Sequence, residues 1–141
     1  MSSHPYEFSD LAVGMSAETS RVFSLEDIAT FRALAPDAAP VHVDRAVAQA
    51  MGYGDVLVFG WLAGAPFSGL LGMELPGPAT VLHSVRIGMV GPVYPGDEIL
   101  YRAEVKQLVV AVKAVVLELV AVRAADQQVV IRGQAQCGFR S

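Results

Sequence analysis

The chain has 141 residues, of which 53% are hydrophobic and 17% are charged, and its formal net charge is −4. A chain of this length and apolar content can bury the core of one domain without a metal or a disulfide, and it is too hydrophobic to be disordered. The acidic balance and the lack of any basic run in the sequence argue against a nucleic-acid partner or an anionic membrane surface. We therefore expect residues 1–141 to form a single domain.

The cysteine content and the first residues bear on the compartment of the protein. Cys137 is the only cysteine, so no internal disulfide can form. The N-terminal residues carry neither the basic start nor the apolar stretch of a secretory signal. We expect a cytoplasmic protein.

The first part of the chain predicts a strand followed by a helix. Residues 16–23 have an extended pattern. Ser24 is a candidate N-cap three residues before Asp27, and it opens a helix over residues 25–35. Pro36 ends this helix, because proline disfavours the helical conformation in the residue before it and has no N–H to donate.

The next segment predicts a loop and a second short helix. Residues 36–44 contain Pro36 and Pro40, and we expect a stiff loop there. Asp44 can then cap a helix over residues 45–51, which stops at a pair of glycines around a tyrosine.

Residues 56–73 contain no charged residue and reach the lower length limit of a membrane span. Because several glycines and Pro66 fall within a strand-rich chain, we interpret the segment as one long buried helix rather than a span. Residues 60, 64, 68 and 72 are Gly, Gly, Ser and Gly, which places small side chains along one helix face. We favour close packing of this face against a sheet or a partner helix, and a groove for an extended ligand is a compatible alternative.

Apolar residues alternate with a period of two after Pro78, which is typical of strands. The pattern predicts half-buried strands over residues 79–90, 98–106 and 127–137, and a strand that is apolar on both faces over residues 109–124. The whole chain therefore predicts an α+β fold in which an antiparallel sheet wraps around a long central helix. The second apolar face of residues 109–124 needs a cover that this chain cannot supply, so we infer a partner subunit.

Few residues carry a chemical motif. The sequence has no phosphate-binding glycine loop after a strand, no nucleophile elbow and no closely spaced Cys/His set, and we expect neither a metal nor a cofactor. His83 and Cys137 fall on apolar strand faces, where we expect a core or interface histidine and an inert thiol.

Asp37 and His42 differ from these residues, because they lie five positions apart in the proline-stiffened loop. A carboxylate and an imidazole so placed could both act on one water molecule. Their spacing alone fits capping and surface roles equally well.

Residues 37–44, Asp-Ala-Ala-Pro-Val-His-Val-Asp, are similar to the Asp-x-Asn-Pro-x-His-x-Asp stretch of the MaoC-like, (R)-specific enoyl-CoA hydratases, a branch of the hot-dog superfamily. Four other stretches resemble the same family in the same order: Val-Gly-Met at 13–15, Phe-Gly-Trp-Leu at 59–62, Phe-Ser-Gly-Leu-Leu-Gly at 67–72 and Pro-Val-Tyr-Pro-Gly-Asp-Glu at 92–98. Pro36, Ala39 and Phe59 stand where the family pattern has Gly, Asn and His.

The resemblance implies a homodimer of hot-dog subunits that hydrates trans-2-enoyl-CoA to (R)-3-hydroxyacyl-CoA and also catalyses the reverse reaction. It implies that Asp37 and His42 position and deprotonate water, and that the backbone N–H of Gly60 binds the thioester oxygen. First-turn amides suit that task, because they lack intrahelical partners and the helix dipole favours negative charge there. Ser68 and Leu71 would limit the acyl chain.

An alternative is a non-catalytic hot-dog domain that binds acyl thioesters or serves as the structural subunit of a larger assembly. Ala39 and Phe59, in place of the usual Asn and His, would suit that alternative. Thioesterase action is disfavoured because the resemblance lies in the hydratase loop.

Overall fold

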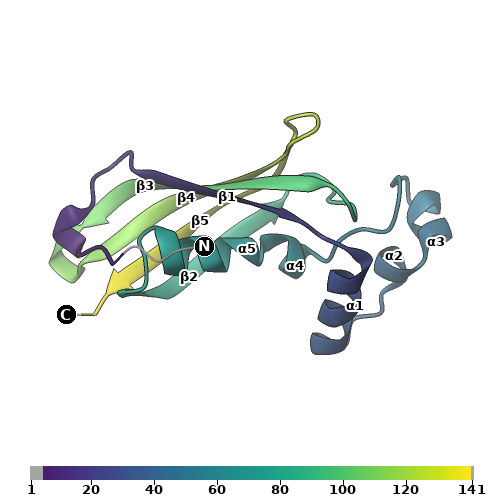
Figure 1. Ribbon diagram of the computed structural model, residues 1–141, viewed down its shortest axis with the longest axis horizontal. Helices are drawn as coiled ribbons and strands as arrows, with labels where there is room; N and C mark the ends of the chain where they lie inside the picture. The colour runs from purple at the N-terminus through teal and green to yellow at the C-terminus, as the bar shows by residue number, and fades with distance from the viewer. Residues whose placement is uncertain (1–4, 141) are drawn as a thin grey trace.

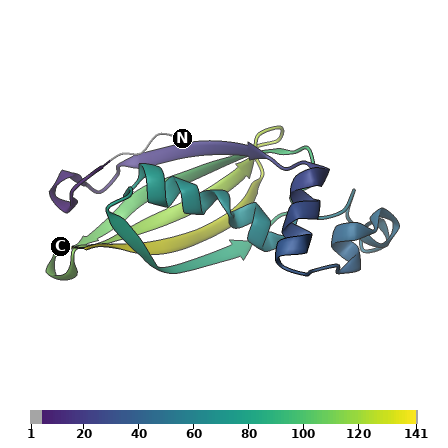
Figure 2. The same ribbon diagram turned by 60° about the horizontal axis from the view of Figure 1, so that its bottom comes forward.

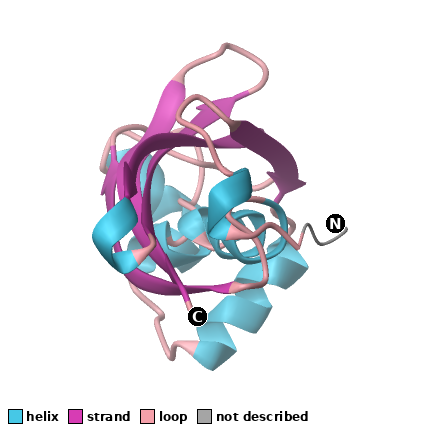
Figure 3. Cartoon of the chain, turned by 90° about the vertical axis from the view of Figure 1, so that its left-hand side faces the viewer, coloured by secondary structure: helices cyan, strands magenta, loops and turns pink. Residues whose placement is uncertain are grey.

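The structure is a computed structural model and describes residues 5–140. One antiparallel sheet of five strands, in the order β1–β3–β4–β5–β2, curves around a set of helical segments (Figures 1 and 2). An end-on view shows the central helix inside the curve of the sheet (Figure 3). The strands are β1 (Ser16–Val22), β2 (Thr80–Met89), β3 (Glu98–Val109), β4 (Ala114–Arg123) and β5 (Val129–Phe139).

The central helix is shorter than predicted and is made of three segments. These are α4 (Gly60–Gly64), α5 (Pro66–Gly69) and the π-helical η2 (Leu70–Glu74). The prediction of one long central helix is confirmed, because Ala65 and Leu70 at the segment boundaries also have right-handed helical φ and ψ, but the predicted start at residue 56 is wrong. Near Pro66, which has no N–H, the helix tightens, and the Ala65 N–H donates to the Leu62 carbonyl at 3.0 Å. Within residues 5–140, no helix combines the length and the apolar character that a bilayer crossing requires.

The residues before Gly60 are not helical, and other parts of the chain hold them in place. The Leu57 N–H donates to the Val41 carbonyl at 3.0 Å, and the Val58 N–H donates to the Val93 carbonyl at 2.9 Å. Phe59 has a φ of −53° and a ψ of 136°, which lies outside the helical region, so the helix begins at Gly60.

The core lies between the sheet and the central helix. The Tyr101 hydroxyl on β3 donates to the Ala63 carbonyl of α4 at 2.5 Å, and its ring meets Phe67 edge-on at 5.0 Å. Burial raises the pKa of Tyr101 well above its ordinary value, so the phenol stays a neutral donor. Cys137 lies in the same core, and burial raises the pKa of its thiol to about 11.

The two predicted helix caps before residue 52 are confirmed. In α1 (Leu25–Leu34), the Asp27 N–H donates to the Ser24 hydroxyl while the Ser24 N–H donates to the Asp27 carboxylate, both at 3.0 Å. In α3 (Arg45–Ala50), the Asp44 carboxylate accepts from the Val47 N–H at 3.3 Å.

Two predicted boundaries are wrong. The loop over residues 36–44 contains a short helix, α2 (Pro40–Val43), since proline at the first helical position is preorganised for a helix. The strand predicted from residue 109 begins at Ala114, after a 3₁₀ turn, η3 (Val110–Val112), and a left-handed Lys113 with φ of 50°. This turn contains neither Gly nor Pro, so the sequence carried no turn signal.

Strand β2 is not half-buried as predicted. It lies at one edge of the sheet, and its large apolar side chains Val81, Leu82, Val85 and Met89 are 45–47% exposed. His83 is exposed as well, at an irregularity in the pairing with β5. On the outer face of β4, Val116, Val120 and Val122 are half-buried. The apolar surface that needs a cover is therefore found mainly on β2.

Two glycines allow β2 to pack closely against β5 and against the central helix. A Cβ at Gly133 on β5 would collide with the backbone carbonyl oxygen of Arg86 on β2. A Cβ at Gly64 would lie 2.6 Å from Cδ1 of Ile87, which is the free end of a flexible side chain. The predicted small-residue face of the helix thus packs on the sheet at Gly64.

We expect Gly133→Ala to lower the free energy of unfolding by roughly 1–3 kcal/mol, because relief of the clash must separate two paired strands. Gly64→Ala should change it by less, since Ile87 can rotate and alanine is a better helix former by about 1 kcal/mol. Chemical denaturation measures both values. An equal or larger loss in Gly64→Ala would contradict this account of the packing.

Candidate active site

The loop that carries Asp37 and His42 lies at the N-terminal end of the central helix. Helices α1, α2 and α3 gather beyond that end of the sheet, next to the start of α4 (Figures 1 and 2). Tertiary hydrogen bonds described above hold residues 57 and 58 between this loop and the segment that follows β2.

The orientation of His42 is fixed by a backbone carbonyl. Nδ1 of His42 donates to the Leu57 carbonyl oxygen, at 2.7 Å. A carbonyl oxygen can only accept, so Nδ1 carries the hydrogen, and neutral His42 keeps a lone pair on Nε2. The half-buried imidazole is therefore set up as an acceptor of a proton at Nε2.

Aromatic packing holds the same ring from its face. The His42 and Phe59 ring centroids lie 4.4 Å apart with an interplanar angle of 30°. Phe59 is 2% exposed and contacts Phe31 of α1 at 5.0 Å. The imidazole thus rests on a buried aromatic pair that leaves its ring little freedom to tilt.

Asp37 is half-buried in the same loop, and its carboxylate makes a local contact. Oδ1 accepts from the Ala39 N–H at 2.9 Å, which closes a turn typical of aspartate. This contact occupies one carboxylate oxygen and leaves the other for a further donor.

Gly60 is the first residue of α4. The first N–H bonded back within this helix is that of Ala63, which donates to the Phe59 carbonyl at 2.8 Å. The Gly60 N–H is therefore one of the first-turn amides that no helical carbonyl can reach. Because Gly60 follows Phe59, on which His42 rests, the structure brings this amide and the imidazole into one neighbourhood.

The predicted acyl-pocket residues differ in exposure. Ser68 is exposed, whereas Leu71 is 3% exposed and belongs to the core. A groove of about 480 Å³ runs between β1 and the central helix, and neither residue lines it. The assignment of Ser68 and Leu71 to an acyl pocket stays a prediction.

Two groups at this site were missed in the sequence. The Leu57 carbonyl is a backbone atom and has no side-chain signature. Phe59 differs from the family pattern, but nothing in the sequence indicates that its ring packs on His42. Within residues 5–140, no group of three or more His, Cys, Asp or Glu side chains could hold a metal ion.

Comparison with known proteins gives concordant results. Residues 10–128 match the family model described as a MaoC like domain. The chain is 37% identical over 98 residues to the (R)-specific enoyl-CoA hydratase of Aeromonas caviae, a match that covers 70% of this chain and 73% of that protein. It is 37% identical over 90 residues to a mitochondrial 3-hydroxyacyl-[acyl-carrier-protein] dehydratase of Arabidopsis thaliana, covering 64% of this chain and 53% of that one.

Among solved structures, the chain resembles the (R)-hydratase from A. caviae involved in PHA biosynthesis. The TM-score is 0.86 at 30% sequence identity, and the superposition covers 92% of this chain and 98% of that chain. The curved sheet, the central helix and their order along the chain are therefore shared.

Proposed function

This chain belongs to the family of MaoC-like domains, and we propose from that premise that it is a hydratase/dehydratase of enoyl thioesters. The resemblance noted in the sequence is confirmed, and so is the hot-dog fold. In this proposal residues 1–141 form one such domain, and the reaction adds water across a trans-2,3 double bond to give an (R)-3-hydroxyacyl product. The observation that carries the proposal is the hydrogen bond from His42 to the Leu57 carbonyl.

That hydrogen bond supports a base role for His42. With its hydrogen on Nδ1, the imidazole takes a proton from water at Nε2. The free oxygen of the Asp37 carboxylate accepts the second hydrogen of the same water and orients it. The water oxygen then bonds to C3 of the enoyl group, and the C2=C3 electron pair moves towards the thioester. The protonated His42 returns its proton from Nε2 to C2, which completes the addition and restores the neutral imidazole, so that one molecule of water is consumed for each product.

The charge that develops on the thioester oxygen needs a donor. The Gly60 N–H is suited to this role, since it lacks a helical partner and lies at the positive end of the helix dipole. One donor of this kind can lower the barrier by about 2.7–4 kcal/mol.

Dimerisation is part of the proposal. As an edge strand, β2 presents unpaired backbone groups together with its exposed apolar side chains. Pairing of β2 with the β2 of a second copy would join two sheets and cover Val81, Val85 and Met89. The acyl-CoA thioester and this second copy are the partners that we propose.

Removal of either catalytic side chain should abolish most of the turnover. We expect Asp37→Asn and His42→Ala each to lower kcat for crotonyl-CoA hydration by about 10²–10⁴-fold, as is typical of general acid–base groups. The double variant should be little worse than the poorer single variant, because the two groups act on one water. Loss of absorbance at the enoyl-thioester band measures the rate.

Asp10→Asn is the matched control for these variants. Asp10 also accepts a backbone N–H, that of Glu7 at 2.8 Å. Its segment, the 3₁₀ turn η1 (Phe8–Asp10), is drawn in purple at the end of the sheet opposite α1, α2 and α3 (Figure 1). Asp10→Asn should keep the parent rate. If His42→Ala hydrates crotonyl-CoA as fast as Asp10→Asn does, the catalytic assignment fails and a non-catalytic thioester-binding domain replaces it.

The dimer should be lost when charge is placed on β2. We expect the parent to sediment as a dimer at micromolar concentration, with an interface above about 2,000 Å² in total. Val85→Glu should sediment as a monomer, because an unpaired carboxylate would be buried between the copies. Val110→Glu, at a site that is 74% exposed in the β3–β4 turn, should stay dimeric. A monomeric parent would refute the proposal.

Shortening Leu71 should lengthen the preferred acyl chain. Leu71→Ala opens space on the central helix, and we expect kcat/KM to shift towards longer enoyl-CoAs. Leu70→Ala is the control, because Leu70 is equally large and fully buried in the same turn. A series of enoyl-CoAs of increasing length measures the profile. If both variants show the parent profile, the acyl pocket lies elsewhere.

A further inference from the structure

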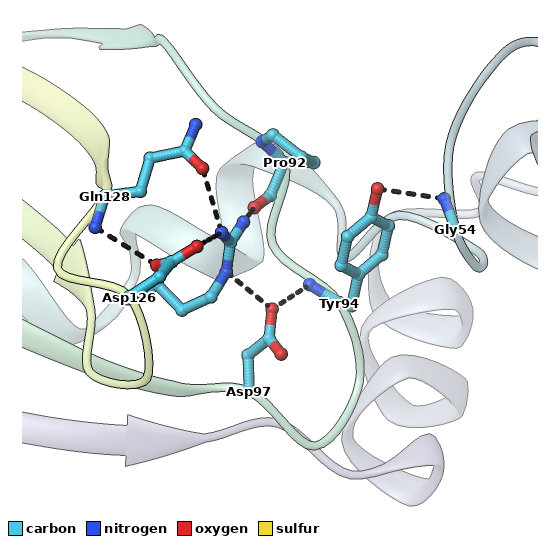
Figure 4. A network of polar contacts seen from close by, with 7 residues as sticks. Gly54, Pro92, Tyr94, Asp97, Asp126 and Gln128 are labelled. Atoms are coloured by element: carbon cyan, nitrogen blue, oxygen red, sulfur yellow. Dashed lines mark hydrogen bonds and ion pairs between the residues drawn. The ribbon is translucent and has the colours of Figure 1, made fainter.

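One half-buried arginine joins two segments that lie far apart in the sequence, residues 92–97 and residues 123–128. Arg123, the last residue of β4, has a side chain that is 11% exposed. Its guanidinium contacts the carboxylates of Asp97 at 3.2 Å and Asp126 at 2.8 Å, the side-chain oxygen of Gln128 at 3.0 Å, and the backbone carbonyl of Pro92 (Figure 4). Arginine suits this position, since its planar fork presents several donors at once.

The cluster pairs one cation with two carboxylates. Burial opposes the charge on Arg123, but Asp126 and Asp97 outweigh that effect and raise the pKa of the guanidinium. The Gln128 N–H and Arg123 together lower the pKa of Asp126. The hydrogen bonds of Arg123 to Asp97 and to the Pro92 carbonyl hold the turn over residues 92–97 against the β4–β5 hairpin.

The turn over residues 92–97 also holds the segment that precedes the central helix. Asp97 accepts the Tyr94 N–H at 3.0 Å, and the Tyr94 hydroxyl accepts the Gly54 N–H at 3.0 Å (Figure 4). The Val93 carbonyl accepts the Val58 N–H at 2.9 Å. The segment over residues 54–58 is thus fastened to the turn near both of its ends.

The Leu57 carbonyl, which accepts the Nδ1 hydrogen of His42, lies between these two attachments. From this placement we propose that Arg123 and Tyr94 are positioning residues that hold the Leu57 carbonyl against His42. The inference deepens the proposed function, and the kinetic part of its test rests on that function. Neither side chain contacts the substrate in this account. They act through the backbone of residues 54–58.

The physical effect is on the ring nitrogen that carries the hydrogen. While the Leu57 carbonyl stays at 2.7 Å, the Nδ1–H form of His42 is favoured and Nε2 is free to accept a proton. If the segment moves, that preference weakens, and a larger share of His42 carries its hydrogen on Nε2, where it cannot act as a base. A displacement of about 1 Å in a catalytic group can cost about 10²-fold in rate.

Two variants remove these supports in graded steps. Tyr94→Phe deletes the hydroxyl that accepts the Gly54 N–H and leaves the rest of the turn in place. Arg123→Gln deletes the cation that joins the Pro92 carbonyl to Asp97. We expect kcat for crotonyl-CoA to fall roughly tenfold to a hundredfold in Arg123→Gln and less in Tyr94→Phe, with KM changed by less than about twofold, since binding contacts remain.

Nitrogen-15 NMR of the histidine side chains gives the readout that does not need activity. In the parent, His42 should be in the Nδ1–H form at pH values where it is neutral, and its signal is identified by its loss in His42→Gln. Both variants should show a larger Nε2–H share. Cys137→Ala is the control, because buried Cys137 pairs with Val115 near the start of β4, whereas Arg123 is the last residue of that strand. It should weaken the core and leave the tautomer and kcat unchanged.

The possible outcomes separate this inference from the proposed function. A parent that hydrates crotonyl-CoA, with variants that match Cys137→Ala in both tautomer and kcat, overturns the positioning role. A parent without hydratase activity overturns the proposed function, and the NMR comparison still tests the positioning role. If Arg123→Gln does not fold, the milder Tyr94→Phe decides by the same two measurements.

Discussion

A helix leaves the N–H groups of its first turn without partners, and the residue at which it begins therefore decides where those donors lie. In this chain, the central helix begins at Gly60 without a side-chain cap, because Phe59 has a ψ of 136°, outside the helical region. The N–H groups of Leu57 and Val58 donate to the Val41 and Val93 carbonyls, and these tertiary hydrogen bonds hold the segment before the helix in place. The same constraint leaves the Leu57 carbonyl outside the helix, where His42 reaches it.

The dependence of this segment on tertiary contacts explains which parts of the structure the sequence could predict. The caps at Ser24 and Asp44 were predictable, because a side chain bonds to a backbone group three residues away. The strand alternation and the order of elements likewise follow from local patterns. The start of the central helix at Gly60 could not be predicted in this way. The conformation of the segment before Gly60 depends on hydrogen bonds to the Val41 and Val93 carbonyls, which come close to it only after folding.

The turn over residues 110–113 shows the complementary limit. Its residues Val, Ala, Val and Lys are typical of a continuing strand, yet the chain reverses there with Lys113 in the left-handed region. The antiparallel register of β3 and β4 pairs Val109 with Ala114, and this register imposes the turn. For the candidate site, a motif could identify Asp37 and His42, whereas the groups that orient them are backbone atoms or distant side chains, and no local pattern contains them.

The contacts of Ala39 and Phe59 show what these two departures from the family pattern do in the structure. An Asn in place of Ala39 could use its amide to brace the loop, but here the Ala39 backbone N–H donates directly to Asp37. Phe59 stands where the family has His, and its ring supports His42 from the face while burying itself against Phe31. Both replacements therefore keep the loop ordered by packing and backbone contacts instead of by polar side chains. An ordered loop of this kind meets the requirement that catalytic or binding groups be held to within about half an ångström.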